Sequence, residues 1–201
     1  MPTPLYPTFE KRINDATHRI IENQVTPWAF LKSNQNFNIK QFDGREIHYG
    51  LPSYEGSPQL VFWGGYIDPF LEDMAEKEIS EAVSLASERK IDLKLLLPEV
   101  EGLLLSSTRK VLDRMTDIDQ RLRGNGFPEN VRPRSTEREF DRMRQFISVR
   151  ASSELAMWKP KSSIEDWYER NKFIVLIFTT IFGSGTLFAV ANLILKFFEK
   201  P

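Results

Sequence analysis

The feature that most constrains this chain is a stretch of 23 residues without a single charge, from Phe173 to Leu195. As an α-helix it would be about 34 Å long, enough to cross a hydrocarbon core of about 30 Å. Fourteen of its residues are Phe, Ile, Leu or Val. Together they contribute roughly −4 to −8 kcal/mol to membrane insertion. Buried helices of soluble proteins rarely contain so long an apolar run, so the stretch predicts a transmembrane helix.

The flanking residues support this prediction and suggest an orientation. Residues typical of a membrane interface surround the stretch, namely Trp167, Tyr168, Arg170, Lys172 and Lys196. Residues 159–172 carry four Lys or Arg side chains and residues 196–201 carry two, a bias that favours a cytosolic N-terminal side. The first residues lack the basic and apolar regions of a secretory signal. We therefore expect a tail-anchored, single-pass membrane protein whose N-terminal domain is cytosolic.

Small residues inside the span indicate that it packs against another helix. They are Thr180, Gly183, Ser184, Gly185 and Ala189. Small side chains let two backbones approach closely, which drives helix association in lipid. The alternative is that these residues only form a local kink or reflect the usual composition of membrane helices. Gly185 and Ala189 share one face, and Thr180 and Ser184 share a neighbouring one. We expect the span to self-associate through these small residues.

The chain as a whole has the composition of a soluble globular protein, with 27% charged residues and a net charge of −1. We expect the fold class to be mainly α with a small antiparallel β-sheet (α+β) in the soluble part, plus one C-terminal transmembrane helix. The expected parts are a helical domain over 1–160, a juxtamembrane helix over 161–172, the span over 173–195 and a short tail over 196–201.

Apolar residues at helical spacing predict four helices in the soluble domain, over residues 8–24, 68–90, 98–123 and 136–158. Thr8, Asp68 and Thr136 are the expected N-caps, because their side chains can accept hydrogen bonds from free backbone N–H groups. In the third helix one face is continuous for about six turns. It consists of Val100, Leu104, Ser107, Val111, Met115, Ile118 and Leu122.

A small sheet is predicted within about 37–63. Residues 37–49 resemble a hairpin with a two-residue turn at Asp43-Gly44. Residues 59–63, Gln-Leu-Val-Phe-Trp, predict a third strand. So small a sheet needs a helix packed against it to be stable.

The charges of the soluble domain are unevenly distributed. Residues 68–101 contain ten acidic and four basic side chains, whereas residues 121–150 contain eight arginines and four acids. One interpretation is that these helical segments pack against each other or pair between subunits. The other is an arginine surface for an anion or lipid headgroup, formed by Arg132, Arg134, Arg138 and Arg142.

The sequence contains no pattern typical of catalysis or metal binding. Cysteine is absent and only two histidines are present, and His48 with Glu46 is too small a set to hold a metal alone. Residues 62–69 could join a strand to a helix, either as a structural turn or as a phosphate site, with Trp63 and Tyr66 beside a small pocket. We predict no catalytic site, metal, cofactor or specific small molecule. The near-neutral charge argues against nucleic acid.

These features favour a non-enzymatic interaction, adaptor or regulatory module at the cytosolic membrane surface, which binds lipid and either itself or another membrane-associated protein. Two alternatives stay open. The first is a membrane-perturbing effector of the toxin or defence type, whose spans oligomerise when the cytosolic domain senses a signal. The second is a membrane-anchored enzyme with a pocket near Trp63 and Tyr66.

Overall fold

The fold was analysed in a computed structural model, which describes residues 2–32, 36–49, 61–125, 135–158, 167–168 and 171–176. The chain divides into two compact units, Met1–Trp158 and Lys159–Pro201. The boundary lies two residues before the one expected from the sequence.

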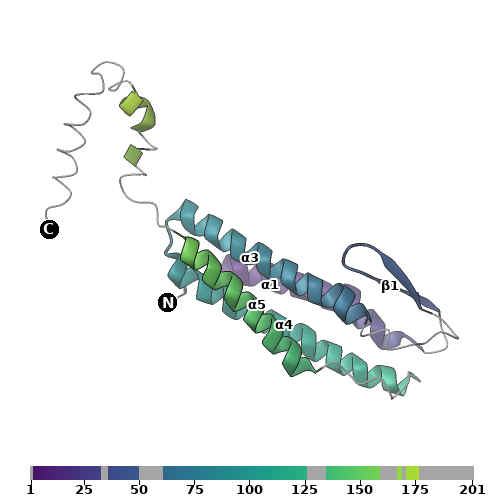
Figure 1. The fold of residues 1–201 in the computed structure, drawn as a ribbon. Coiled ribbons are helices and arrows are strands. Elements are labelled where there is room, and N and C mark those ends of the chain that lie inside the picture. The colour runs from purple at the N-terminus through teal and green to yellow at the C-terminus, as the bar shows by residue number, and fades with distance from the viewer. Residues whose placement is uncertain are drawn as a thin grey trace. The chain divides into compact units, whose positions relative to one another are not determined.

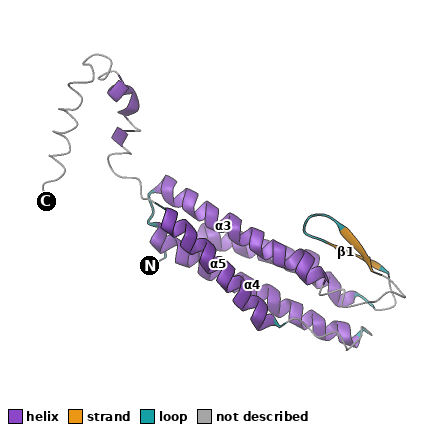
Figure 2. Cartoon of the chain, in the orientation of Figure 1, coloured by secondary structure: helices purple, strands orange, loops and turns teal. Residues whose placement is uncertain are grey.

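The first unit is mostly helical, as predicted (Figure 1, Figure 2). Among the described residues, its long helices are α1 (Tyr6–Ile20), α3 (Asp68–Arg89), α4 (Leu93–Gly124) and α5 (Thr136–Met157). Two π-helical turns, η1 (Ile21–Val25) and η3 (Trp63–Ile67), and a 3₁₀ segment, η2 (Thr26–Phe30), extend the helical path beyond α1 and before α3.

Helix α4 is central, because it packs against α1, α3 and α5. All seven residues predicted for its inner face are buried. Helix α1 runs parallel to α4, since the Thr3 hydroxyl donates to Glu99 at one end and the Asn125 side chain donates to the Ala29 carbonyl at the other. Helices α3 and α5 run in the opposite direction (Figure 1).

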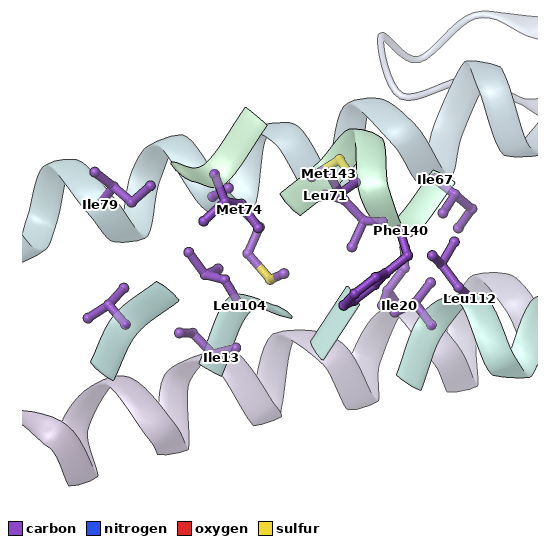
Figure 3. Close-up of a cluster of buried hydrophobic side chains, with 14 of the residues drawn as sticks. Ile13, Ile20, Ile67, Leu71, Met74, Ile79, Leu104, Leu112, Phe140 and Met143 are labelled. Carbon is purple, nitrogen blue, oxygen red and sulfur yellow. The ribbon is translucent and has the colours of Figure 1, made fainter. Parts of the chain in front are cut away.

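The core lies between these four helices (Figure 3). Every helix contributes apolar side chains to it, including Ile13, Ile20, Leu71, Met74, Ile79, Leu104, Leu112, Phe140 and Met143. Burying such side chains removes apolar surface from water, which is the main driving force for assembling the bundle.

Helix α4 begins at Leu93, five residues before the predicted start. Asp92 caps it, because its carboxylate accepts the backbone N–H of Lys94 at 2.9 Å. Pro98 therefore lies inside the helix. Its missing N–H would have bonded to the carbonyl of exposed Lys94, so water can replace that bond at low cost.

The N-caps predicted for the other helices were wrong. Helix α1 starts at Tyr6, with Pro7 in its first turn and Leu5 in the cap position instead of Thr8. In α5 the cap is Ser135, whose hydroxyl accepts the backbone N–H of Arg138 at 3.3 Å. Thr136 instead shares a 2.8 Å hydrogen bond with Thr116 of α4.

The predicted hairpin is present and antiparallel, with β1 (Phe37–Lys40) paired to β2 (Glu46–Tyr49) and Ile39 opposite Ile47. The two-residue turn was wrong. The backbone N–H of Gln41 still donates to the Arg45 carbonyl at 2.7 Å, which leaves a three-residue loop. Gly44 has a φ of +86°, the left-handed conformation that such a loop requires near its end.

The predicted third strand was wrong over residues 61–63. Val61 and Phe62 are helical, and the π-helical turn η3 leads directly into α3. Asp68 therefore lies within a continuous helical path and is not an N-cap. Residues 50–60 lie outside those that the structure describes. The apolar run over residues 60–63 has only four residues, and so short a run cannot be distinguished from a buried helix by its pattern alone.

Candidate functional site

The segment that begins the uncharged stretch exposes its apolar side chains. Residues 171–176 are helical, and Phe173, Ile174 and Leu176 are exposed by 76%, 51% and 59%. The flanking residues Trp167 and Tyr168 are also exposed. Side chains of this kind are unfavourable in water and favourable in lipid.

The other residues predicted for the membrane interface and for packing of the span lie outside the described part of the chain. They are Arg170, Thr180, Gly183, Ser184, Gly185, Ala189 and Lys196. Lys172 is described and exposed. Within the part of the chain that the structure describes, no helix has the length and apolar composition that crossing a bilayer requires.

An arginine of α5 pairs with carboxylates of the acidic helix α3. Arg142 of α5 contacts Glu72 of α3 at 2.5 Å, Asp68 of α3 at 3.3 Å and Glu139 of its own helix at 3.1 Å. Although partial burial opposes its charge, the hydrogen bond to Glu72 and the charge of Asp68 raise the pKa of Arg142. For Arg142 the structure therefore favours intramolecular pairing.

Of the other three arginines of the predicted anion surface, only Arg138 lies within the described residues. Its side chain is exposed, and its backbone N–H binds the Ser135 cap. Arg132 and Arg134 lie outside the described residues. The anion surface formed by the four arginines therefore stays a prediction.

A second arginine, which the sequence analysis did not identify, binds α3 from the opposite side. The guanidinium group of Arg12 on α1 donates to Glu78 and Glu81. Glu78 is almost fully buried. Two helices thus hold α3 by charge-assisted hydrogen bonds, which are stronger than neutral ones. The only sequence signal was the acidic balance of residues 68–101.

Of the two residues proposed to line a pocket, Tyr66 belongs to an aromatic cluster and Trp63 is buried. Trp63 is only 1% exposed. The Tyr66 ring stacks on Phe62 at 5.5 Å and meets the edge of Phe42, from the hairpin loop, at 6.0 Å. Burial raises the pKa of the Tyr66 phenol. Because residues 61–67 are helical, the strand-to-helix turn expected over residues 62–69, whether structural or a phosphate site, does not form.

The hairpin docks on the π-helical turn η3 at a glycine. The backbone N–H of Phe42 donates to the Gly65 carbonyl at 2.8 Å. The buried Gln41 side chain occupies the space beside Gly65, where a Cβ would lie 1.5 Å from the Gln41 Oε1. A side chain larger than hydrogen at position 65 would therefore displace Gln41. The sequence analysis missed this contact, since no local pattern links residues 41 and 65.

The polar residues of the hairpin bind each other. The Asn38 side chain lies between Glu46, at 2.9 Å from its amide nitrogen, and His48, at 3.0 Å from its amide oxygen. Among the residues described, no group of three acidic, histidine or cysteine side chains could hold a metal ion.

The same end of the bundle exposes large hydrophobic side chains. Phe30 of η2, Phe42 of the loop and Ile47 of β2 are exposed by 74%, 39% and 42%. They lie where α1 and α4 end and α3 and α5 begin, opposite to the end at which α5 reaches Trp158 (Figure 1). Exposed apolar patches often mark contact sites for proteins.

Comparison with protein-family models, with curated proteins and with solved structures finds no match for this chain. Its function is therefore argued from its own residues and geometry.

Proposed function

We propose that this chain is a single-pass membrane protein, anchored through residues 173–195, whose helical unit is a non-enzymatic interaction, adaptor or regulatory module on the cytosolic side. The observation that carries the proposal is the 23-residue uncharged stretch, which follows a compact unit with its own hydrophobic core. Such a stretch is long enough to span a bilayer as a helix.

Two further observations support the anchor. Phe173, Ile174 and Leu176 at its start are exposed, which is unfavourable unless lipid or another protein covers them. The excess of Lys and Arg before the stretch supports a cytosolic N-terminal unit.

The end of the bundle that carries Phe30, Phe42 and Ile47 is the surface we propose for a protein partner. We call it the hairpin end. Its apolar side chains are exposed although the bundle itself has a well-buried core. An anchored protein meets its partners in two dimensions, so a small apolar contact gains from the raised local concentration.

We further propose that the spans pack against each other through Gly185 and Ala189. Small residues at this spacing allow close contact between helices in lipid.

Membrane integration is tested by expressing the full chain and washing membranes with alkaline carbonate. We expect the chain to stay in the pellet, and a variant with Leu176→Arg and Leu187→Arg to be released, because each buried arginine costs about 2.5–3.5 kcal/mol on the insertion scale. A glycosylation acceptor placed before Trp158 should stay unmodified. Release of the unaltered chain, or modification of that acceptor, would contradict the proposal.

The hairpin end is tested by chemical crosslinking of full-length protein in its native membrane. We expect Phe30→Glu to remove the heterologous crosslinked species that the unaltered chain forms. The matched control is Val149→Glu, since Val149 is also highly exposed but lies on α5. Equal loss in both variants, or in neither, would show that the hairpin end is not the contact surface.

Packing of the spans is tested in the same membranes. Gly185→Leu should reduce the crosslinked homo-oligomer, because the larger side chain separates the helices. Ala191→Leu is the control on another face of the span. An unchanged oligomer in Gly185→Leu would rule out this packing face.

A further inference from the structure

We propose that the β1–β2 hairpin covers a binding site, and that a partner protein fills this site with an extended apolar segment in place of the hairpin. We call the site the aromatic platform. It consists of the rings of Trp28, Phe62 and Tyr66 at the hairpin end. The inference rests on the proposed function and deepens it, because it names what the partner presents to the hairpin end.

The three rings of the aromatic platform form a continuous row. Trp28 belongs to η2, Phe62 comes directly before η3, and Tyr66 lies within η3. The centre of the Phe62 ring lies 4.8 Å from that of Trp28 and 5.5 Å from that of Tyr66. Aromatic rings at these distances attract each other and offer a large apolar area for binding.

The first strand of the hairpin shows which kind of segment fits the platform. Along β1 and the residue after it, Ile39 and Gln41 are buried. Their neighbours Asn38 and Lys40 are exposed. Such alternation is typical of an extended chain that lies with one face on an apolar surface. A partner segment with apolar side chains at alternate positions would match the same surface.

The rings of the hairpin contact both ends of the platform. Phe37 meets the edge of Trp28 at 5.8 Å, and Phe42 meets the edge of Tyr66 at 6.0 Å. The backbone N–H of Phe42 also donates to the Gly65 carbonyl at 2.8 Å. Every residue type except proline carries such a backbone donor. The platform therefore recognises two apolar rings and one backbone N–H, which another protein can supply.

The docked hairpin contains an unfavourable group. The Gln41 side chain is buried, and its amide nitrogen finds no acceptor among the described residues. A buried donor without an acceptor raises the free energy of the docked state, whereas water satisfies it once the hairpin leaves. A displaced state is therefore within reach as a minor form of the protein.

The helical turns beside the platform are also less favourable than an ordinary α-helix. Both η1 and η3 are π-helical, and both lie at the hairpin end (Figure 2). Turns of this kind are rare and occur frequently at functional sites. Gly64 and Gly65 lie within η3, and glycine disfavours helix formation. These features favour a binding role for this end of the bundle over a purely structural one.

A partner protein fits the site better than the hairpin of a second copy does. Exchange of identical hairpins would form the same contacts and leave the same Gln41 amide nitrogen without an acceptor. It would also lose the high effective concentration of a tethered hairpin. A foreign segment can carry an apolar residue in place of Gln41 and also cover Phe30, which is 74% exposed two residues after Trp28.

The first test uses a fluorescent peptide with the sequence of residues 36–49 as the probe. Binding to the full-length protein in detergent is measured by fluorescence anisotropy. Ile39→Asp in the protein should displace its own hairpin, because Ile39 is fully buried. The peptide should then bind about ten-fold more tightly or better, since a displaced state populated to about 10% or less lowers the apparent affinity of the unaltered chain by that fraction.

Two controls accompany this test. Val149→Asp introduces the same charge at an exposed hydrophobic position of α5, and it should bind the peptide like the unaltered chain. A peptide that itself carries Ile39→Asp should bind none of the three proteins.

The second test locks the hairpin on the platform. A Cβ at position 65 would lie 2.4 Å from the Gln41 Cδ, so Gln41→Cys with Gly65→Cys brings two thiols close enough for a disulfide and removes the Gln41 side chain that would clash. No other cysteine is present. In crosslinking of the full-length protein in its native membrane, oxidised glutathione should remove the heterologous species and a thiol reductant should restore it. Gln41→Cys alone should respond to neither reagent.

Several results would overturn this inference. They are equal binding of the peptide to the unaltered chain and to Ile39→Asp, an equal gain in Val149→Asp, and a locked protein that keeps its heterologous species. A lock that removes only the homo-oligomer would also overturn it, because the occupant would then be a second copy. If Ile39→Asp unfolds the bundle, the lock decides alone.

Phe30→Glu separates this failure from that of the proposed function. If Phe30→Glu removes the heterologous species and the lock does not, only this inference has failed. If neither changes that species, the hairpin end is not the contact surface and the proposed function has failed there.

Discussion

The helical bundle and the hairpin are stabilised in different ways. The bundle buries one face of every long helix against α4 or its neighbours. The hairpin has two four-residue strands. It is held by a backbone hydrogen bond to Gly65, by the buried Gln41 side chain, and by ring contacts of Phe37 with Trp28 and of Phe42 with Tyr66. The comparison shows that the bundle depends on a repeated apolar pattern, whereas the hairpin depends on a few contacts between residues far apart in sequence.

The largest loss of stability should follow a substitution in the core of the bundle. Leu104 is 1% exposed at the centre of α4, so Leu104→Ala should lower the free energy of unfolding by about 2–5 kcal/mol. The change is measured by denaturant unfolding of the purified full-length protein in detergent. Leu95→Ala, at an exposed site on the same helix, should change it by less than about 0.5 kcal/mol. Similar losses in both variants would contradict the assignment of the core.

The second largest loss of stability should be confined to the hairpin and follow a substitution at Gly65. Gly65→Ala places a Cβ where the Gln41 side chain lies, and forcing the two apart should cost about 1–3 kcal/mol. We expect faster amide hydrogen exchange in residues 37–49, with little change in α4. Adding Gln41→Ala should restore part of the protection by making room.

Gly102 provides the control for this substitution. A Cβ at Gly102 meets nothing within 4 Å, and Gly102 lies inside α4. Gly102→Ala should therefore stabilise the protein by about 0.5–1 kcal/mol. Global unfolding in Gly65→Ala would show that the hairpin and the bundle are a single cooperative unit.

A smaller effect should come from the edge of the bundle, at the start of α5. Ser135→Ala removes the side chain that accepts the Arg138 backbone N–H, and such caps contribute about 1 kcal/mol. The first turn of α5 should lose protection in hydrogen exchange before the rest of the helix does. Ser148→Ala, an exposed position within α5, should leave that turn unchanged.

The smallest effect should be a pH dependence at the same end of α5. The hydrogen bond from Arg109 lowers the pKa of the Glu137 carboxyl. A carboxyl whose folded pKa is lowered contributes stability above its unfolded pKa, and this contribution is lost as the pH falls through the folded value. Since both groups are exposed, salt should weaken the effect.

An NMR titration of Glu137 checks this prediction. Its pKa should rise toward the ordinary value of a glutamate in Arg109→Gln. The control is Arg144→Gln, whose weaker influence on Glu137 predicts a smaller rise. A Glu137 pKa that is the same in the unaltered chain and in Arg109→Gln would contradict the ion pair.

The two regions also differ in how much of them the sequence predicted. Every inner residue predicted for α4 is buried, because a long helical pattern leaves little ambiguity. The start of α4 was missed, since Pro98 resembles a helix start although Asp92 caps the helix earlier. The strand predicted at 59–63 was wrong over residues 61–63, because apolar residues such as Phe62 are buried equally well in a helix.

The candidate site was predictable only where composition decides it. The membrane anchor stays a prediction, made from the absence of charge over 23 residues. The partners of Arg142 could be inferred only as a class, because acidic and basic segments were seen to complement each other. The pairing of Arg12 with Glu78, and the exposure of Leu95 beside the α3–α4 turn, depend on how helices distant in sequence are placed.

The length of α4 has a further consequence for an anchored protein. Its 32 residues form a single rod of about 48 Å, at 1.5 Å per residue. This rod keeps the hairpin end that far from the end of the bundle at which α5 finishes. Because a small domain is only about 30 Å across, a partner bound at the hairpin end would leave the other end of the bundle uncovered.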